Sequence, residues 1–233
     1  EETAEESERQ SAYRSYLQKN EALLQQRQAI CRERLLRQYP STPELVQKLT
    51  GGQAAEVLWN RNARAEDFTT VRLGLGRMDI SSMIRTPAVR FSIRSDELEE
   101  QPAKLKADYQ TILQIPSLLC IGQHKLTGII GEQARVQEVV RNIVLQLAML
   151  HSYTDVRLIG LFREGEQELF SWLRWLPHVF SPDKSHRLLA CSEADYQAVL
   201  SYLLDVLRAR DSRDALQSGE APLPVYVVLC TDP

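Results

Sequence analysis

The turn at residues 129–133 is the place in this sequence where residue types and position most favour ligand chemistry. An apolar run at residues 126–130 predicts a strand before it, and an amphipathic pattern at residues 133–151 predicts a helix after it. In nucleotide hydrolases this turn carries G-x-x-x-x-G-K-[ST]. Its backbone N–H groups bind the phosphates, its Lys neutralises their charge, and its Ser or Thr holds Mg²⁺. The order of elements therefore predicts a nucleotide site at Gly131.

The side chains that such a site needs are missing. Counted from Gly131, the required Gly, Lys and Ser/Thr fall on Val136, Gln137 and Glu138, and a start at Gly128 gives no better match. Val136 has a Cβ where close backbone approach is needed, Gln137 has no charge, and Glu138 would repel a triphosphate. We expect a vestigial nucleotide pocket without a catalytic residue or a cofactor. Its remaining members are Gly131, Glu132, Gln133, Arg135 and Asp232.

Asp232 belongs to this set because it follows the final predicted strand, residues 225–230, where an active site would place its magnesium-binding acid. It stands one residue further on than ideal, and Pro233 replaces the usual second acid. A turn residue is therefore the favoured interpretation of Asp232. The chain stops directly after a buried strand, and we expect it to be a piece of a longer protein.

Other short patterns predict no site. Gly74-Leu75-Gly76 has no third glycine and no following helix start, so we interpret it as a turn or bulge. The four histidines show no metal-ligand spacing, which predicts no metal site. The four cysteines form no CxxC pair, and we expect reduced, buried thiols. No Ser-His-Asp or Cys-His set stands out.

Charge and composition exclude several classes of protein. The chain has 28 basic and 31 acidic side chains, a formal charge of −3, which argues against nucleic-acid binding through bulk charge. Hydrophobic residues make up 43% and charged residues 25%, as in globular domains. The longest apolar runs are far shorter than the roughly 20 residues that cross a bilayer. We expect a soluble stretch of chain.

The first part of the chain predicts a long helical arm. Residues 7–38 contain no Gly or Pro, and Pro40 ends the pattern. Apolar side chains recur seven residues apart in two rows, which is typical of a helix that lies against a partner. We predict a stalk and linker over residues 1–50. Its candidate interface residues are Tyr16, Leu17, Leu23, Leu24 and Ile30.

From residue 51 onward, strands and helices alternate, which favours a parallel sheet covered on both faces. The expected fold class is α/β. We predict a three-layer, P-loop-NTPase-like domain with a mostly parallel sheet over residues 51–233, preceded by the helical arm. The expected strands are residues 68–73, 88–93, 117–121, 126–130, 156–162, 188–191 and 225–230. The expected helices are residues 43–49, 96–113, 133–151, 166–176 and 193–210.

The predicted helix at residues 166–176 carries Trp172 and Trp175, three residues apart, and Pro177 ends it. Core packing is the favoured interpretation of these two aromatic side chains. A docking surface is the alternative, so both are interface candidates.

Several segments together resemble one family. Leu58-Trp59-Asn60-Arg61, Asp67-Phe68 and residues 71–76 resemble its LWeR…DF…vRlGlG pattern, and residues 172–178 resemble its WlkWLPH box. Residues 131–151 and 155–161 resemble its strand–helix–strand region, in which a long helix ends in QLA…LHS. The family is the FtsK/SpoIIIE-type membrane ATPase of type VII secretion systems (EccC/EssC). The match is to its first cytoplasmic module and covers nearly the whole chain.

The resemblance implies a module with an ATPase-like fold and a degenerate nucleotide site, whose arm descends from a membrane anchor. It implies a parent motor that uses ATP and Mg²⁺, works as a hexamer and exports small helical WXG-type proteins. The expected partners are other subunits of the secretion membrane complex and downstream ATPase domains. The expected location is the cytoplasmic face of the bacterial plasma membrane.

Three functions compete. The favoured one is a non-hydrolysing regulatory and scaffolding module, which is not an enzyme. The second is a divergent ATPase, in which Arg135 contacts a phosphate from the first turn of its helix. The third is a DNA translocase fragment, against which the net charge of −3 and the lack of a Lys/Arg cluster speak.

Overall fold

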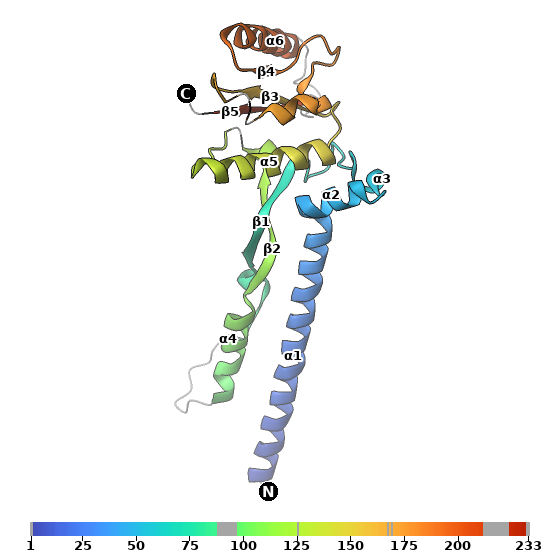
Figure 1. Ribbon diagram of the computed structural model, residues 1–233. Coiled ribbons are helices and arrows are strands. Elements are labelled where there is room, and N and C mark those ends of the chain that lie inside the picture. Colours follow the sequence, from blue (N-terminus) through green and yellow to red (C-terminus); the bar gives the residue numbers. More distant parts are fainter. Residues whose placement is uncertain are drawn as a thin grey trace. The chain divides into compact units, whose positions relative to one another are not determined.

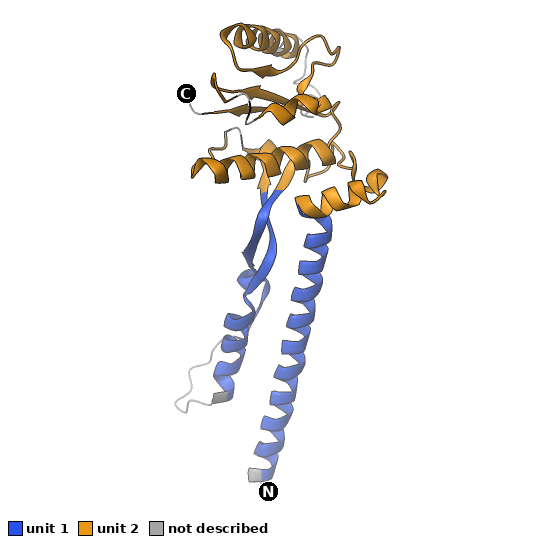
Figure 2. Cartoon of the chain, in the orientation of Figure 1, with its two compact units in different colours: residues 1–41, 72–118 blue, residues 42–71, 119–233 orange. Residues whose placement is uncertain are grey.

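The computed structural model describes residues 2–87, 97–124, 126–166, 168, 170–211 and 224–231 (Figure 1). The chain divides into two compact units, shown in separate colours in Figure 2. Unit 1 comprises residues 1–41 and 72–118, and unit 2 comprises residues 42–71 and 119–233. The domain boundary expected at residue 50 stays a prediction. The compact units group the residues differently, because residues 72–118 pack on the helical arm.

Unit 1 is built on the long helix α1 (Glu2–Gln38), so the predicted helical arm is confirmed. Helix α4 (Glu97–Tyr109) packs along it (Figure 1). The side-chain amide of Gln28 donates to the backbone carbonyl of Tyr109 at 2.7 Å, and the Tyr109 hydroxyl donates to the Glu21 carboxylate at 2.9 Å. One side of α1 is therefore occupied within unit 1.

Strands β1 (Thr70–Asp79) and β2 (Thr111–Cys120) form a two-stranded sheet. A buried cluster of three isoleucines lies at one end of it, and Cys31 and Leu35 of α1 pack against this cluster. The isoleucines are Ile80, Ile112 and Ile115. The hairpin and the arm therefore share one small core.

Gly74-Leu75-Gly76 lies inside β1, so the turn or bulge interpretation was wrong. The strand continues through both glycines, although a Cβ on Gly74 would meet nothing within 4 Å. A Cβ on Gly76 would lie 3.4 Å from the Cβ of Ser117 on β2. The pattern is part of a sheet and forms no phosphate-binding loop.

Two short helices begin unit 2, namely α2 (Thr42–Thr50) and α3 (Ala54–Val57). Leu45 and Val57 from these helices are buried against the end of the long helix α5 (Gln133–Leu150), which the sequence predicted. Their contacts there are with Met149 and Leu150.

The main sheet of unit 2 has three parallel strands in the order β4-β3-β5. They are β3 (Val156–Leu161), β4 (Leu189–Ala190) and β5 (Val225–Cys230). The central strand β3 is buried along almost its whole length, which explains why every residue of it except Arg157 is apolar or glycine. The predicted parallel sheet is confirmed.

Helices cover both faces of this sheet, as Figure 1 shows. Ile143, Val144 and Leu147 of α5 pack in one cluster with Val156 and Leu158 of β3. On the other face, Ile159 of β3 packs in a second cluster with Val199 of helix α6 (Glu193–Asp211). Unit 2 is therefore an α/β unit of three layers, helix, sheet and helix. The structure does not establish the P-loop form of that fold.

The strand predicted at residues 126–130 does not form. Leu126 is 92% exposed and Ile130 is 101% exposed, so neither side chain is covered by a neighbour. A run of apolar residues becomes a strand only where another strand pairs with it. α5 is therefore preceded by an extended segment without sheet pairing, and this part of the topology prediction was wrong.

The helix predicted at residues 166–176 was also wrong, because the described helical geometry there is short and of the 3₁₀ type. It comprises η3 (Ser171–Trp175), which is followed by η4 (Pro177–Val179). Pro177 forces Leu176 into an extended conformation with ψ of 132°, which separates the two pieces. Such 3₁₀ segments are characteristically short.

The remaining differences concern boundaries. α4 ends at Tyr109 and β2 begins at Thr111, so the helix predicted to residue 113 was too long and the strand predicted from residue 117 started too late. Two further 3₁₀ turns are η1 (Ser81–Met83) and η2 (Ile121–Gln123). The strand predicted at residues 88–93 lies outside the described residues.

All four cysteines are free thiols. The expectation that they are buried was wrong, because Cys230 is exposed and the other three are only partly covered. In the described part of the chain, no helix combines the length and apolarity that crossing a membrane requires.

Candidate functional site

The vestigial pocket lies at the carboxyl end of the main sheet of unit 2, where α5 begins. Its volume is about 340 Å³. Gly131 and Gln133 line it together with Phe162, which follows β3, and Thr231, which follows β5. Parallel α/β sheets bind ligands at this edge, because the loops after the strands and the first turn of the helix meet there. The structure therefore brings part of the predicted site into a real cavity.

The charge of this pocket does not suit a nucleotide. No basic side chain is among the described residues that line it. Glu166 does line it, and its Oε2 atom is buried without a hydrogen-bond partner. Among the described lining residues, a triphosphate placed here would meet a carboxylate and no neutralising cation. The cavity can hold an apolar or cationic group but does not fit phosphate.

Arg135 does not supply the missing cation. Its guanidinium forms an ion pair with Glu138 at 3.2 Å, and its side chain is 75% exposed. Neither Arg135 nor Glu132 lines the pocket. Glu132 is the residue before the first turn of α5, and its side chain makes no capping hydrogen bond. Asp232 lies outside the described residues.

Gly131 has none of the geometry that makes glycine necessary in a phosphate-binding loop. Its φ is not among the positive values of the described glycines, which are those of Gly52 and Gly165. A Cβ at this position would approach only the Cγ2 of Val136, at an ordinary 3.7 Å. The backbone at Gly131 therefore leads into helix α5 without forming a phosphate-binding loop.

Apart from Thr127 and Gln137, the remainder of the described lining is apolar. The rings of Phe162 and Phe170 are stacked with centroids 4.1 Å apart and an interplanar angle of 5°. Both rings line the cavity, as do Val136 and Val140 of α5. Aromatic stacking of this kind fixes the wall of the pocket.

The two heptad rows of α1 differ in exposure. Tyr16 is 61% exposed, Leu23 is 43% exposed and Ile30 is 42% exposed. Leu17 instead lines a groove with Leu98 of α4, and Leu24 is half-buried. The first row is available to another protein, whereas the second is at least partly used within unit 1.

The two tryptophans differ in the same way. Trp172 is half-buried, packs against the main core of unit 2 and has the guanidinium of Arg141 5.9 Å from its ring centroid. Trp175 is 80% exposed. Core packing therefore describes Trp172, and the docking alternative applies to Trp175.

A polar cluster that sequence reasoning missed lies at the carboxyl end of α5. The backbone N–H of Trp59 donates to the carbonyl of Met149 at 2.9 Å, and the N–H of Arg61 donates to that of Leu150 at 3.0 Å. The Trp59 indole N–H donates to the carbonyl of Ala148 at 3.2 Å. These bonds satisfy carbonyls that the end of a helix leaves without an intrahelical donor.

His151 is the centre of this cluster and is fully buried. Its Nε2 accepts the backbone N–H of Thr69 at 3.1 Å, which requires the neutral ring with the proton on Nδ1, and Nδ1 lies 3.2 Å from the carbonyl of Leu147. Phe68 packs edge-on against the ring, with centroids 5.1 Å apart. Burial lowers the pKa of His151 to about 4.

His178, from the segment after Trp175, completes the cluster. Its Nε2 donates to the backbone carbonyl of His151 at 2.9 Å. Burial also lowers the pKa of His178. The segments at residues 58–61, 67–68, 147–151 and 172–178 therefore meet in one place, where they join α5 to the chain before β1 and the chain after β3.

The sequence contained one signal for this cluster. The patterns LWNR, DF, LHS and WLPH each combine an aromatic or apolar residue with a polar one that can reach a backbone group. Their meeting point depends on tertiary packing, which spacing along the chain does not encode. Among the described residues, no three His, Cys, Asp or Glu side chains form a group that could hold a metal ion.

Comparison with known proteins finds relatives in bacterial secretion systems. The chain is 27% identical over 225 residues to the ESX secretion system protein EccC of Geobacillus thermodenitrificans. It is 24% identical over 210 residues to the ESX secretion system protein YukB of Bacillus subtilis, and 24% identical over 228 residues to the type VII secretion system protein EssC of Staphylococcus aureus. No model of a known protein family matches the chain.

These matches cover 96%, 90% and 96% of the chain but only 15%, 14% and 15% of the three relatives. The chain therefore spans about one-seventh of the length of the proteins that it resembles.

Proposed function

Because the chain belongs to the EccC/EssC family of type VII secretion proteins, we propose that it is a non-hydrolysing regulatory and scaffolding module. In this role it couples the membrane complex of the secretion system to ATPase domains elsewhere in a longer parent chain. The parent is a hexameric motor at the cytoplasmic face of the membrane that exports WXG-type proteins. ATP and Mg²⁺ act in its other domains.

The observation that carries the scaffolding role is the exposed row Tyr16, Leu23 and Ile30 on α1. These side chains recur at heptad spacing, the pattern by which one helix packs on another. Leu17 of the neighbouring row lines a groove with α4, whereas the described residues of unit 1 leave the exposed row uncovered. A helix of another subunit of the membrane complex is the partner that this geometry suits.

The vestigial pocket supports the absence of hydrolysis. The described residues that line it include the carboxylate of Glu166 and no basic side chain. Gly131 lacks the backbone geometry of a phosphate-binding loop. No observation favours the divergent ATPase over this proposal. Arg135, on which that alternative depended, is paired with Glu138 outside the pocket lining.

Charge placed on the exposed row tests the scaffolding role. The triple variant Tyr16→Glu, Leu23→Glu and Ile30→Glu in the full-length parent is expected to reduce co-purification with the membrane complex and secretion of its substrate at least about tenfold. Three carboxylates cannot be desolvated at a helix–helix contact without loss of affinity. Quantitative immunoblots of membrane complexes and culture supernatants measure both effects.

A matched variant on the same helix controls for general effects of added charge. Ser15, Ala22 and Gln26 also lie on α1, are exposed and belong to neither row. The variant Ser15→Glu, Ala22→Glu and Gln26→Glu adds the same three carboxylates and should leave assembly and secretion unchanged. Normal assembly and secretion by the triple variant, at wild-type protein levels, would contradict the proposed role of this row.

A further inference from the structure

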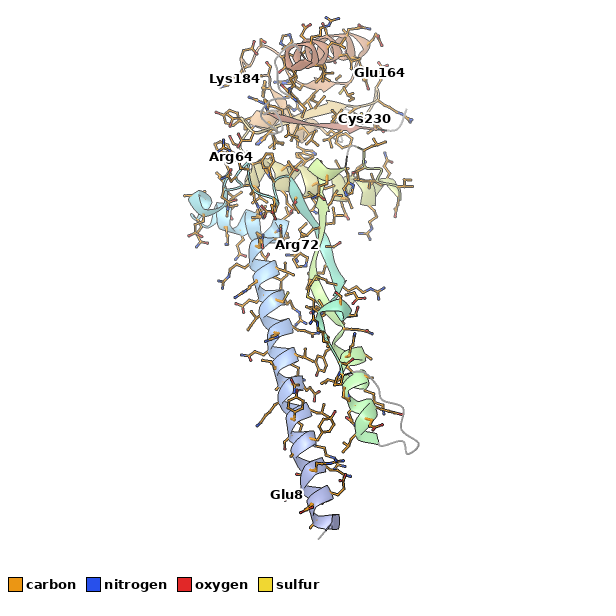
Figure 3. The ribbon with its side chains drawn as sticks, turned by 180° about the vertical axis from the view of Figure 1, so that it is seen from behind. Glu8, Arg64, Arg72, Glu164, Lys184 and Cys230 are labelled. Atoms are coloured by element: carbon orange, nitrogen blue, oxygen red, sulfur yellow. The ribbon has the colours of Figure 1, made fainter. Side chains whose placement is uncertain are left out.

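A second pocket lies beside the start of β3, at the opposite end of that strand from the vestigial pocket. Its volume is about 380 Å³. Figure 3 shows Lys184, which lines it, on one side of unit 2, and Cys230, which lines the vestigial pocket, on the other side. The described lining contains aromatic and proline rings, the hydroxyls of Tyr153 and Ser181, and two cations, but no carboxylate. These residues are Tyr153, Arg157, Trp175, Pro177, Phe180, Ser181, Pro182 and Lys184.

Arg157 is the unusual member of this lining, because it is only 4% exposed. Its Nη1 donates to the backbone carbonyl of Phe180 at 2.5 Å and lies 3.4 Å from that of Pro177. Its guanidinium carbon is 5.5 Å from the ring centroid of Tyr153. Its Nε is buried and has no hydrogen-bond partner. In the described part of the chain, no carboxylate forms an ion pair with it.

The buried guanidinium of Arg157 therefore lacks both a counter-charge and part of its hydrogen-bond acceptors among the described residues. Removing an arginine from water is costly unless a counter-charge and hydrogen-bond acceptors replace the water. The two carbonyls engage Nη1, which leaves the edge formed by Nε–H and Nη2–H without an acceptor among the described residues. This edge has the fork geometry that binds both oxygens of a carboxylate. Arg157 is therefore prepared for an anionic group that enters the pocket.

The acid of the loop around the pocket, Asp183, is engaged by hydroxyls of its own loop and is not part of the described lining. The Asp183 carboxylate accepts hydrogen bonds from the hydroxyl of Ser181 at 2.5 Å and from that of Ser185 at 2.6 Å. These bonds hold the pKa of Asp183 below its ordinary range. Lys184, which has a φ of 60° in this tight turn, forms no ion pair among the described residues. The pocket consequently keeps a net positive lining.

The rim of the pocket suits a peptide better than a small free anion. Trp175 is 80% exposed, and it lies with Pro177 and Pro182 in the same lining as the two cations. A large exposed aromatic ring beside rigid prolines is typical of an anchor for a partner's apolar side chain. The lining thus offers an apolar contact next to a charged one.

We propose that this pocket binds an acidic segment of a partner protein, whose carboxylate pairs with Arg157 and Lys184 while a neighbouring apolar side chain packs on Trp175. This pocket is distinct from the exposed row on α1. Its proposed binding of an acidic segment does not depend on whether the module hydrolyses nucleotide. Arg157 recognises the carboxylate, Lys184 adds attraction from the rim, and Trp175 contributes apolar contact.

The test uses the 233-residue chain and a capped hexapeptide of alternating leucine and glutamate as the probe. Nuclear magnetic resonance follows the Nε–H signal of Arg157 and the indole N–H signal of Trp175 during titration. The acidic peptide is expected to shift both signals with a millimolar or tighter dissociation constant. The matched leucine–glutamine peptide is expected to bind at least about tenfold more weakly, because charge-assisted hydrogen bonds are lost.

Two surface variants keep the test independent of folding. Lys184→Gln and Trp175→Ala change exposed side chains and should each weaken the acidic peptide several-fold, whereas Arg208→Gln, on the exposed surface of α6, should not. Equal binding of the two peptides, or no binding at peptide concentrations up to about 10 mM, would overturn the proposal. Inorganic phosphate that shifts the two signals as effectively as the peptide would overturn the assignment to a protein partner.

Discussion

Replacing His151 by alanine is expected to lower the free energy of unfolding by about 3 kcal/mol. The side chain is fully buried, so the substitution leaves a cavity between α5 and Phe68. It also removes the acceptor of the Thr69 N–H, which leaves one buried backbone donor without a partner. The Leu147 carbonyl loses the ring N–H but keeps its bond from the backbone N–H of residue 151. Urea denaturation followed by circular dichroism at neutral pH measures the change.

The matched control for this substitution is His124→Ala. His124 is exposed, so its removal should change the free energy of unfolding by no more than about 0.5 kcal/mol. If the two variants lost equal stability, His151 would not have the structural role that its contacts indicate.

Lowering the pH from 7 to 4 is expected to reduce the free energy of unfolding by about 3 kcal/mol through His151 alone. The pKa of this histidine is about 4 in the folded chain, against 6.5 for the ordinary side chain. Between these two values the unfolded chain binds a proton that the folded chain does not bind. Stability is therefore complete above pH 6.5 and decreases as the pH falls toward 4. The lowered pKa of His178 acts in the same direction.

The variant His151→Gln separates this contribution from the others. Glutamine can accept and donate hydrogen bonds but does not titrate. Urea denaturation of wild-type and variant chains across pH 4–7 should show a distinctly weaker pH dependence for the variant. The same slope in both chains would place the titrating group elsewhere.

Periodicity predicted the long helices α1, α5 and α6 well, because a repeat of apolar side chains over many turns is a strong signal. The rows on α1 and the apolar face of α5 are examples. The largely apolar sequence of β3, in which Arg157 is the one charged residue, likewise indicated a strand that is buried on both faces. These features depend on local spacing, which the sequence displays directly.

Features that depend on contacts between distant parts of the chain were not predictable from local spacing. Residues 126–130 are as apolar as a strand, but no strand pairs with them. Residues 166–176 have helix-forming spacing, but Pro177 and the stacked rings of Phe162 and Phe170 constrain their path. In both cases tertiary contacts override local preference.

The candidate site shows the same division. The absence of a phosphate-binding lysine near Gly131 was visible in the sequence. The presence of the Glu166 carboxylate in the pocket was not visible in the sequence, because Glu166 is far from Gly131 along the chain and only the fold brings the two residues into one lining. The unsatisfied guanidinium of Arg157 was equally hidden within an apolar strand.

We propose above all that this module works without using nucleotide. Calorimetric titration of Mg·ATP into the chain, combined with a phosphate-release assay, tests this proposal most directly. We expect no heat of binding up to millimolar nucleotide, which corresponds to a binding free energy weaker than about −4 kcal/mol, and no phosphate release above background. Saturable binding with turnover that Arg135→Ala or Asp232→Ala abolishes would contradict the account and establish a divergent ATPase.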